Sequence, residues 1–163
     1  MSDLPAIVAI IRHGEKPADD SNPHLSDQGR ARAAMLARTL PDIYPKLSAL
    51  FACAPSKDSD RPYETIEPLA KVLGLTIDNS FADHQHAELA QKILEGSKSY
   101  SGKTILICWH HEQIPALARD DFGQASAPAQ WSGHVFDQIW QIDYSAAGQP
   151  TFTIKAEPPM PPG

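Results

Sequence analysis

Four consecutive residues near the start of the chain, Arg12-His13-Gly14-Glu15, combine groups that suit phosphate chemistry. An arginine holds two phosphate oxygens at once through its planar guanidinium group, and a histidine acts as a nucleophile or a proton carrier. Gly14 lets the backbone turn sharply or approach a ligand closely. Because such a short motif also occurs in ordinary surface loops, the rest of the chain must decide its meaning.

Apolar runs in the sequence predict the strands that would position these residues. The run at residues 6–11 directly precedes the motif, and similar runs occupy residues 49–54 and 103–109. Continuous apolar runs are typical of parallel strands that are covered on both faces. Open α/β sheets bind ligands at the carboxyl ends of their strands. We therefore expect the polar residues that follow the three runs to share one edge of one sheet.

Helical spacing of apolar residues predicts helices between these strands. One helix begins after Ser26, which resembles an N-cap, and another spans residues 61–73 with Gly74 as its C-cap. The remaining predictions are helices over residues 87–94 and 114–122 and strands over residues 75–77, 138–144 and 151–156. This alternation predicts a three-layer α/β/α domain with a mostly parallel sheet.

Length and composition limit the class of protein. The chain has 163 residues, which suits one domain, expected over residues 1–157 with an extended or disordered Pro-rich tail at 158–163. The net charge of −6 argues against nucleic acid or an anionic membrane as the main partner. No apolar run approaches the roughly 20 residues that span a bilayer, so we expect a cytoplasmic protein. Its oligomeric state is left open.

The two cysteines, Cys53 and Cys108, each lie within an apolar run and have no CxxC spacing. This placement predicts buried free thiols rather than a disulfide or a metal site. The neighbouring His110 and His111 are not expected to bind one metal ion, because adjacent side chains after a strand point in different directions. We expect no metal and no cofactor.

Polar residues follow all three long apolar runs and complete a possible phosphate pocket. The second run leads to a loop that ends at Arg61, and the third is followed by His110, His111 and Glu112. Two arginines and two histidines would match the charge that a phosphoryl group spreads over its oxygens. One histidine could form a phosphohistidine while a carboxylic acid protonates the leaving alkoxide.

Three segments of the chain resemble the histidine phosphatase superfamily, which includes cofactor-dependent phosphoglycerate mutases and acid phosphatases. Residues 12–15 resemble its signature. Residues 24–33 resemble the pattern Leu-Thr-x-x-Gly-x-x-Gln-Ala, with Arg32 where glutamine is common. Residues 54–65 resemble Ser-x-x-x-Arg-x-x-x-Thr, with a longer spacing between Ser56 and Arg61. The resemblance implies a phosphoglycerate mutase-like fold.

The resemblance also implies roles for individual residues. His13 would be the nucleophile, and Arg12 and Arg61 would bind the phosphoryl oxygens. Gly14 would leave room for the substrate and let a backbone carbonyl orient the His13 ring. Ser56 matches a family position that contacts substrate, although turn formation explains it equally well.

Two assignments remain open at this stage. The second catalytic histidine is His110 if residues 114–117 are aligned with the commonest opening of the family's next helix. It is His111 if the Trp-x-His-x-x-Ile-Pro form of the motif is matched, and His111 is slightly favoured. Glu15 and Glu112 rank together as the proton donor. Asp83 ranks behind them, in the region that also contains Glu88.

The sequence thus predicts a metal-independent phosphomonoester hydrolase that acts through phosphohistidine on a small phosphorylated substrate. A phosphoglycerate mutase-like phosphotransferase is the alternative enzyme, and it is less favoured because a short chain has little sequence to enclose a bisphosphate. A non-catalytic phosphate-binding regulatory module is the alternative outside catalysis.

Overall fold

A single six-stranded sheet forms the centre of the computed structural model, which describes residues 4–19, 21–95, 97–145 and 148–160. Its strands follow the order β3-β2-β4-β1-β5-β6. The elements are, in chain order, β1 (Ile7–Arg12), α1 (Asp27–Ile43), β2 (Leu47–Ala52), α2 (Arg61–Leu73), β3 (Ile77–Asp78), η1 (Asp83–Gln85), α3 (His86–Glu95), η2 (Ser97–Tyr100), β4 (Thr104–Trp109), α4 (Ile114–Ala116), the π-helical η3 (Leu117–Asp121), β5 (Gln138–Asp143) and β6 (Thr151–Ala156).

The sheet is mostly parallel, as predicted. Strands β3, β2, β4 and β1 run parallel to one another, whereas β5 is antiparallel to both β1 and β6. In the β1–β4 pair, Ile7 lies opposite Thr104 and Arg12 lies opposite Trp109. The carboxyl ends of these two strands are therefore level with each other, and β2 ends beside them.

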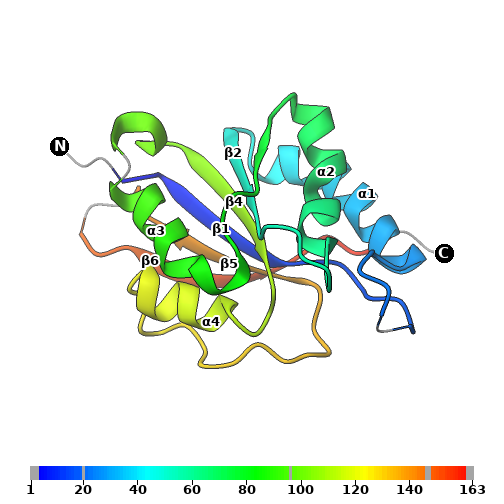
Figure 1. Cartoon of the computed structure of the whole chain (residues 1–163). Helices are drawn as coiled ribbons and strands as arrows, with labels where there is room; N and C mark the ends of the chain where they lie inside the picture. The colour runs from blue at the N-terminus through cyan, green and yellow to red at the C-terminus, as the bar shows by residue number, and fades with distance from the viewer. Residues whose placement is uncertain (1–3, 20, 96, 146–147, 161–163) are drawn as a thin grey trace.

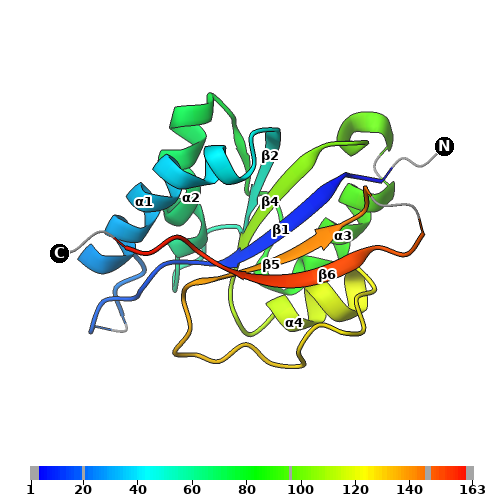
Figure 2. The ribbon, with the colours of Figure 1, turned by 180° about the vertical axis from the view of Figure 1, so that it is seen from behind.

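Helices cover both faces of the sheet and complete the predicted three layers (Figures 1 and 2). Along β1, Ala9 and Ile11 pack with the apolar faces of α1 and α2, whereas Val8 and Ile10 pack with α3, α4 and η3. The alternation arises because successive side chains of a strand point to opposite faces. Burial on both sides explains why the strands have continuous apolar sequences.

The ends of the first two helices agree with their sequence signals. The Ser26 hydroxyl accepts a hydrogen bond from the Gly29 amide at 3.0 Å, as an N-cap residue does. Helix α2 ends at Gly74, which has a left-handed φ of 67° that suits glycine. The glycine signal and the periodicity together predicted both ends of this helix.

Three predicted elements differ from the observed ones. The strand expected at residues 49–54 begins and ends two residues earlier, and the one at residues 75–77 is only the two-residue β3. The helix expected at residues 114–122 is a three-residue α-helix that continues as a π-helix. Its last turn is widened, because the Phe122 amide donates to the Leu117 carbonyl, five residues back.

The residues after β6 remain in contact with the body of the protein. Glu157 is buried, and Met160 packs against the core beneath α1 and α2. Residues 161–163 of the predicted tail lie outside the described residues. Within the part of the chain that is described, no helix is long and apolar enough to cross a membrane.

Candidate active site

The carboxyl ends of β1, β2 and β4 bring the predicted site residues to one edge of the sheet (Figure 1). Arg12 is the last residue of β1, and His13 directly follows it. His110 directly follows β4, and the His13 amide donates to the Trp109 carbonyl at 3.1 Å. The parallel pairing of β1 and β4 thus continues one residue into the site and holds the two histidine backbones side by side.

His13 is buried and oriented by the backbone. The residue is only 1% exposed, and its Nδ1 lies 2.7 Å from the Gly14 carbonyl oxygen. A carbonyl only accepts, so Nδ1 carries the hydrogen and the lone pair is on Nε2. Burial lowers the pKa of His13 well below its ordinary value of 6.5. The ring is therefore a neutral imidazole, the form that acts as a nucleophile.

Gly14 connects the site to α1 and α2. Its amide donates to the Thr65 hydroxyl at 2.8 Å, and that hydroxyl donates to the Arg61 carbonyl at 2.7 Å. A Cβ atom on Gly14 would lie 3.1 Å from the backbone of Gly29, so α1 approaches closely because neither residue has a side chain. Gly14 thus fixes the turn after β1 against two helices.

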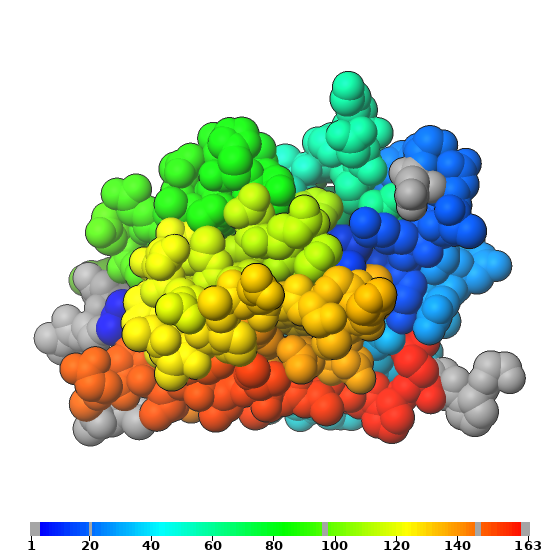
Figure 3. Space-filling model, turned by 90° about the horizontal axis from the view of Figure 1, so that it is seen from below, coloured from blue at the N-terminus to red at the C-terminus, as the bar shows by residue number. Residues whose placement is uncertain are grey.

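Arg12 is held by the segment that follows η3. Its guanidinium carbon lies 3.7 Å from the centre of the Phe136 ring, and Nη1 donates to the carbonyls of Gly133 and Val135, both at 2.9 Å. Among the described residues, its buried Nε has no hydrogen-bond partner. Burial lowers the pKa of Arg12 to about 10, so the group stays charged at neutral pH. Figure 3 shows this segment, in yellow to orange, beside the blue segment that follows β1.

Arg61 occupies the first position of α2 and is only 4% exposed. Its Nε donates to the His24 carbonyl at 3.0 Å, and Nη2 donates to the Asn22 carbonyl. The positive charge of Arg61 contributes to the lowered pKa values of His13 and His110, after burial, which is the largest cause in both. The charge of Arg61 thus disfavours the protonated form of both histidines.

The two candidate histidines after β4 point to different places. The ring of His110 packs edge-on against the ring of His13, with 5.1 Å between their centres. His111 instead lines a separate groove with Trp131 and Gly133. Its Nδ1 lies 3.6 Å from the Glu112 carboxylate. Adjacent residues at the end of a strand diverge, and here it is His110 that faces the His13 ring.

The three candidate acids also have different surroundings. Glu15 is almost fully buried and accepts two hydrogen bonds from Arg32, at 2.9 and 2.7 Å. The side chain of Glu112 is 72% exposed. Asp83 lies at the start of η1, with a carboxylate oxygen within 4.8 Å of a His110 ring nitrogen. Its Oδ1 is buried and has no hydrogen-bond partner in the described part of the chain.

The loop after β2 contributes more to the shape of the site than to its charge. Ser56 is exposed, and its hydroxyl accepts hydrogen bonds from the amides of Asp58 and Ser59, both at 3.2 Å, as in a turn. Ser59 is buried and its hydroxyl accepts from the Arg61 amide. Together with Asp83 and His110, these two serines line a cleft of about 440 Å³.

Several residues of the site lacked a sequence signal. Phe136 and the carbonyls of residues 133 and 135 contact Arg12 across more than 120 residues of chain, so no local pattern connects them. Ser59 lies in the loop whose spacing is longer than in the family pattern, so the pattern did not identify it. Thr65 had a signal, because it completes the motif at residues 54–65, but only the fold shows that it binds the Gly14 amide.

Comparisons with known proteins identify the fold. No family model matches the chain, and no curated protein matches it. Among solved structures, a protein histidine phosphatase SixA complexed with tungstate superposes with a TM-score of 0.61 at 18% identity, covering 92% of this chain and 96% of the other.

Two further structures show the same fold. A mycobacterial glucosyl-3-phosphoglycerate phosphatase with inorganic phosphate has a TM-score of 0.59 at 15% identity, covering 93% and 96% of the two chains. A phosphoglycerate mutase from Bacillus anthracis has a TM-score of 0.57 at 14% identity, covering 94% of each chain. The chain thus has the phosphoglycerate mutase-like fold that is shared by members of the histidine phosphatase superfamily.

Proposed function

We propose that this protein is a phosphatase that hydrolyses a small phosphomonoester through a phosphohistidine on His13. The observation that carries the proposal is a buried, neutral His13 whose Nδ1 is occupied by the Gly14 carbonyl and whose ring packs against His110. Arg12 and Arg61 lie at the same edge of the sheet and supply positive charge for the phosphoryl oxygens. Proteins of the same fold bind tungstate or phosphate.

The reaction has two steps. In the first, Nε2 of His13 attacks phosphorus, the ester P–O bond breaks, and a carboxylic acid donates its proton to the leaving alkoxide. In the second, the resulting carboxylate takes a proton from water, whose oxygen attacks phosphorus, and the P–N bond breaks to release phosphate. Arg12, Arg61 and His110 stabilise the charge on the phosphoryl oxygens in both steps.

We assign the proton transfers to Asp83 and the second histidine role to His110. Asp83 lies beside His110 on the cleft and has an unpartnered oxygen. Glu15, which the motif ranks higher, is bound on both oxygens by Arg32 and does not line the cleft that contains Asp83 and His110. His111, slightly favoured by the motif, lines the other groove.

The test measures hydrolysis of p-nitrophenyl phosphate in the presence of EDTA. We expect turnover by the wild type, none above background for His13→Ala, and a fall of about 10²–10³-fold in kcat for His110→Asn, the loss of one charge-stabilising donor. The matched control His111→Asn should stay within a few-fold of the wild type. Release of inorganic phosphate in equal amount to p-nitrophenol distinguishes hydrolysis from transfer to another acceptor.

Three results would contradict the proposal in different ways. A wild type without turnover that still binds phosphate would favour the regulatory module. Unchanged turnover in His13→Ala would remove the nucleophile assignment. A larger loss in His111→Asn than in His110→Asn would reverse the assignment of the second histidine.

A further inference from the structure

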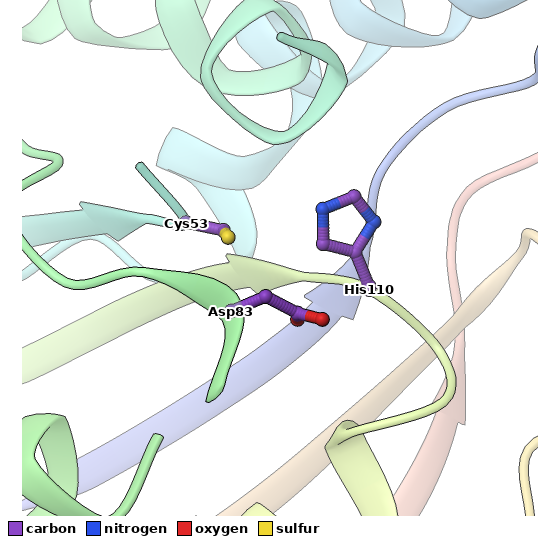
Figure 4. A group of neighbouring side chains, drawn as sticks. All are labelled: Cys53, Asp83 and His110. Carbon is purple, nitrogen blue, oxygen red and sulfur yellow. The ribbon is translucent and has the colours of Figure 1, made fainter. Parts of the chain in front are cut away.

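Cys53, Asp83 and His110 form a compact group of metal-ligating side chains at the mouth of the site. A sulfur, a carboxylate oxygen and a ring nitrogen from these three residues all lie within 4.8 Å of one another. They come from three separate segments: the end of β2, the start of η1 and the end of β4. Figure 4 shows the three side chains gathered around a shared space between these segments.

We propose that this group is a binding site for Zn²⁺ or a similar thiophilic divalent cation, and that the bound ion inhibits the enzyme reversibly. Tetrahedral zinc with thiolate, imidazole and carboxylate ligands places the ligand atoms about 3.4–3.6 Å apart. The three atoms lie within 4.8 Å of one another, so they need to close by at most about 1.4 Å to reach that geometry, a shift that side-chain rotation supplies. The mixed sulfur, nitrogen and oxygen set excludes Mg²⁺ and Ca²⁺, which prefer oxygen ligands.

The environment of the group favours a cation. Asp83 Oδ1 is buried without a hydrogen-bond partner among the described residues, which leaves a desolvated acceptor beside the sulfur. The Cys53 thiol has one weak contact, from Sγ to the Ala54 carbonyl at 3.6 Å. All three residues line the 440 Å³ cleft, so an ion can enter from solvent and keep a water molecule in its fourth position.

Binding exchanges a proton for the metal and involves no redox step. The ion forms bonds to Sγ, to an Asp83 oxygen and to a His110 nitrogen, and the thiol proton leaves to solvent. Burial and the Asp83 charge raise the pKa of Cys53 to about 12, so the thiol is protonated until a metal displaces the proton. Affinity for the metal should therefore increase with pH.

Inhibition follows because the ion would occupy groups that we assign to catalysis. It would hold the Asp83 carboxylate, which then cannot carry a proton, and a nitrogen of His110, which then cannot donate to the phosphoryl oxygens. This consequence rests on the proposed function, whereas metal binding itself does not.

A second group, His24, Asp60 and Glu64, offers a comparison. Its atoms are already used, because His24 Nδ1 bonds one Glu64 oxygen at 2.6 Å and the Leu25 amide donates to the other at 2.9 Å. It also contains no sulfur. Any ion bound there would give no thiolate signal.

The test of binding uses Co²⁺ as a spectroscopic probe with the full chain. We expect a thiolate-to-cobalt charge-transfer band in the near ultraviolet for the wild type, displaced by Zn²⁺ and absent in Cys53→Ser and Cys53→Ala. The matched control is Cys108→Ser, because Cys108 is buried on the opposite face of the sheet and should keep the band. Thermal unfolding of each variant confirms that it is folded.

The test of inhibition measures hydrolysis of p-nitrophenyl phosphate against Zn²⁺ concentration, with EDTA added afterwards to restore activity. Loss of an outer-shell partner already costs about 10–100-fold in metal affinity, so loss of the sulfur ligand should raise the inhibitory concentration at least that much. A wild type without the cobalt band, or a band that persists in folded Cys53→Ala, would overturn the site. A normal band without inhibition would overturn only its effect on catalysis, and a band in an inactive wild type would contradict the proposed function alone.

Discussion

Two buried arginines near the end of β1, Arg12 and Arg32, have opposite kinds of partner. Arg32 is bound by two carboxylates, because it donates to both oxygens of Glu15 and to Glu157 Oε1 at 2.9 Å. Arg12 donates to two backbone carbonyls and stacks on Phe136, and it forms no ion pair with any described residue. Carboxylates neutralise a guanidinium, whereas carbonyls hold it in place and leave its charge available.

Glu15, Arg32 and Glu157 form a structural cluster of hydrogen-bonded charged groups, whereas Arg12 and His13 form the cluster that we propose to be reactive. In the structural cluster two carboxyl groups face one guanidinium, and burial raises the pKa of Glu157 to about 8 despite the attraction of Arg32, so Glu157 is largely protonated at neutral pH. The charge of Arg12 is not paired with any described carboxylate, and His110, whose ring packs against His13, lines the 440 Å³ cleft. Within the Arg12-His13-Gly14-Glu15 motif, we propose that the first two residues take part in the reaction, whereas Glu15 binds Arg32 of α1, which also binds Glu157 after β6.

The largest effect is expected from breaking the structural cluster. Arg32→Met leaves two buried carboxylates without a partner, and removing one member of a buried ion pair costs about 3–5 kcal/mol of unfolding free energy. Denaturant unfolding measures the loss. The control Arg30→Met removes an exposed pair with Asp27 on the same helix and should change stability by no more than about 0.5 kcal/mol. Equal losses in the two variants would show that the buried cluster contributes nothing special.

The reactive cluster is tested by Arg12→Lys. A lysine keeps the charge but cannot stack on Phe136 and donate to two carbonyls while still presenting hydrogens to a phosphoryl group. We expect kcat/KM for p-nitrophenyl phosphate to fall about 10²–10³-fold. Arg119→Lys is the control, since Arg119 also donates to a backbone carbonyl, that of Ala127, and we assign it no part in the reaction. A comparable fall in the control would mean that the effect is not specific to the site.

The pH dependence of stability tests the raised pKa of Glu157 in the structural cluster. Because the folded pKa of Glu157 is raised from 4.5 to about 8, the folded protein binds more protons than the unfolded chain between these values. Stability should then decrease as the pH rises through this window, with a slope of at most about 1.4 kcal/mol per pH unit. The slope is measured between pH 6.5 and 8, above the ordinary pKa of His13. Glu157→Gln should flatten it; an unchanged slope would assign it to another group.

The last effect concerns the close approach of α1 to the motif. A Cβ on Gly29 would lie 2.6 Å from the Glu15 carbonyl oxygen, so Gly29→Ala must displace backbone and should cost about 1–3 kcal/mol. In the control Gly133→Ala, the added Cβ would contact only the His111 ring, at an ordinary distance of 3.6 Å. Thermal unfolding compares the two. Equal stability would show that α1 moves aside without cost.

Local sequence features predicted most elements and the common edge of the site. Strands β1, β2 and β4 were each recognised from an apolar run that fits burial on both faces, and α2 was recognised from its periodicity and its closing glycine. The free, buried state of Cys53 and Cys108 was predicted and is confirmed. The phosphoglycerate mutase-like fold, implied by the resemblance, is confirmed by the solved structures.

The chain by itself therefore determined which residue types follow β1, β2 and β4, because the carboxyl ends of buried parallel strands lie at one edge of a sheet. Only the tertiary structure decided their partners. It turned His110 toward His13 and His111 away, bound Glu15 to Arg32 and Glu157, and placed Asp83 beside Cys53. These choices depend on contacts between segments that are distant in the chain. Adjacent residues such as His110 and His111 point in different directions, so a shift of one residue reverses which side chain faces the pocket.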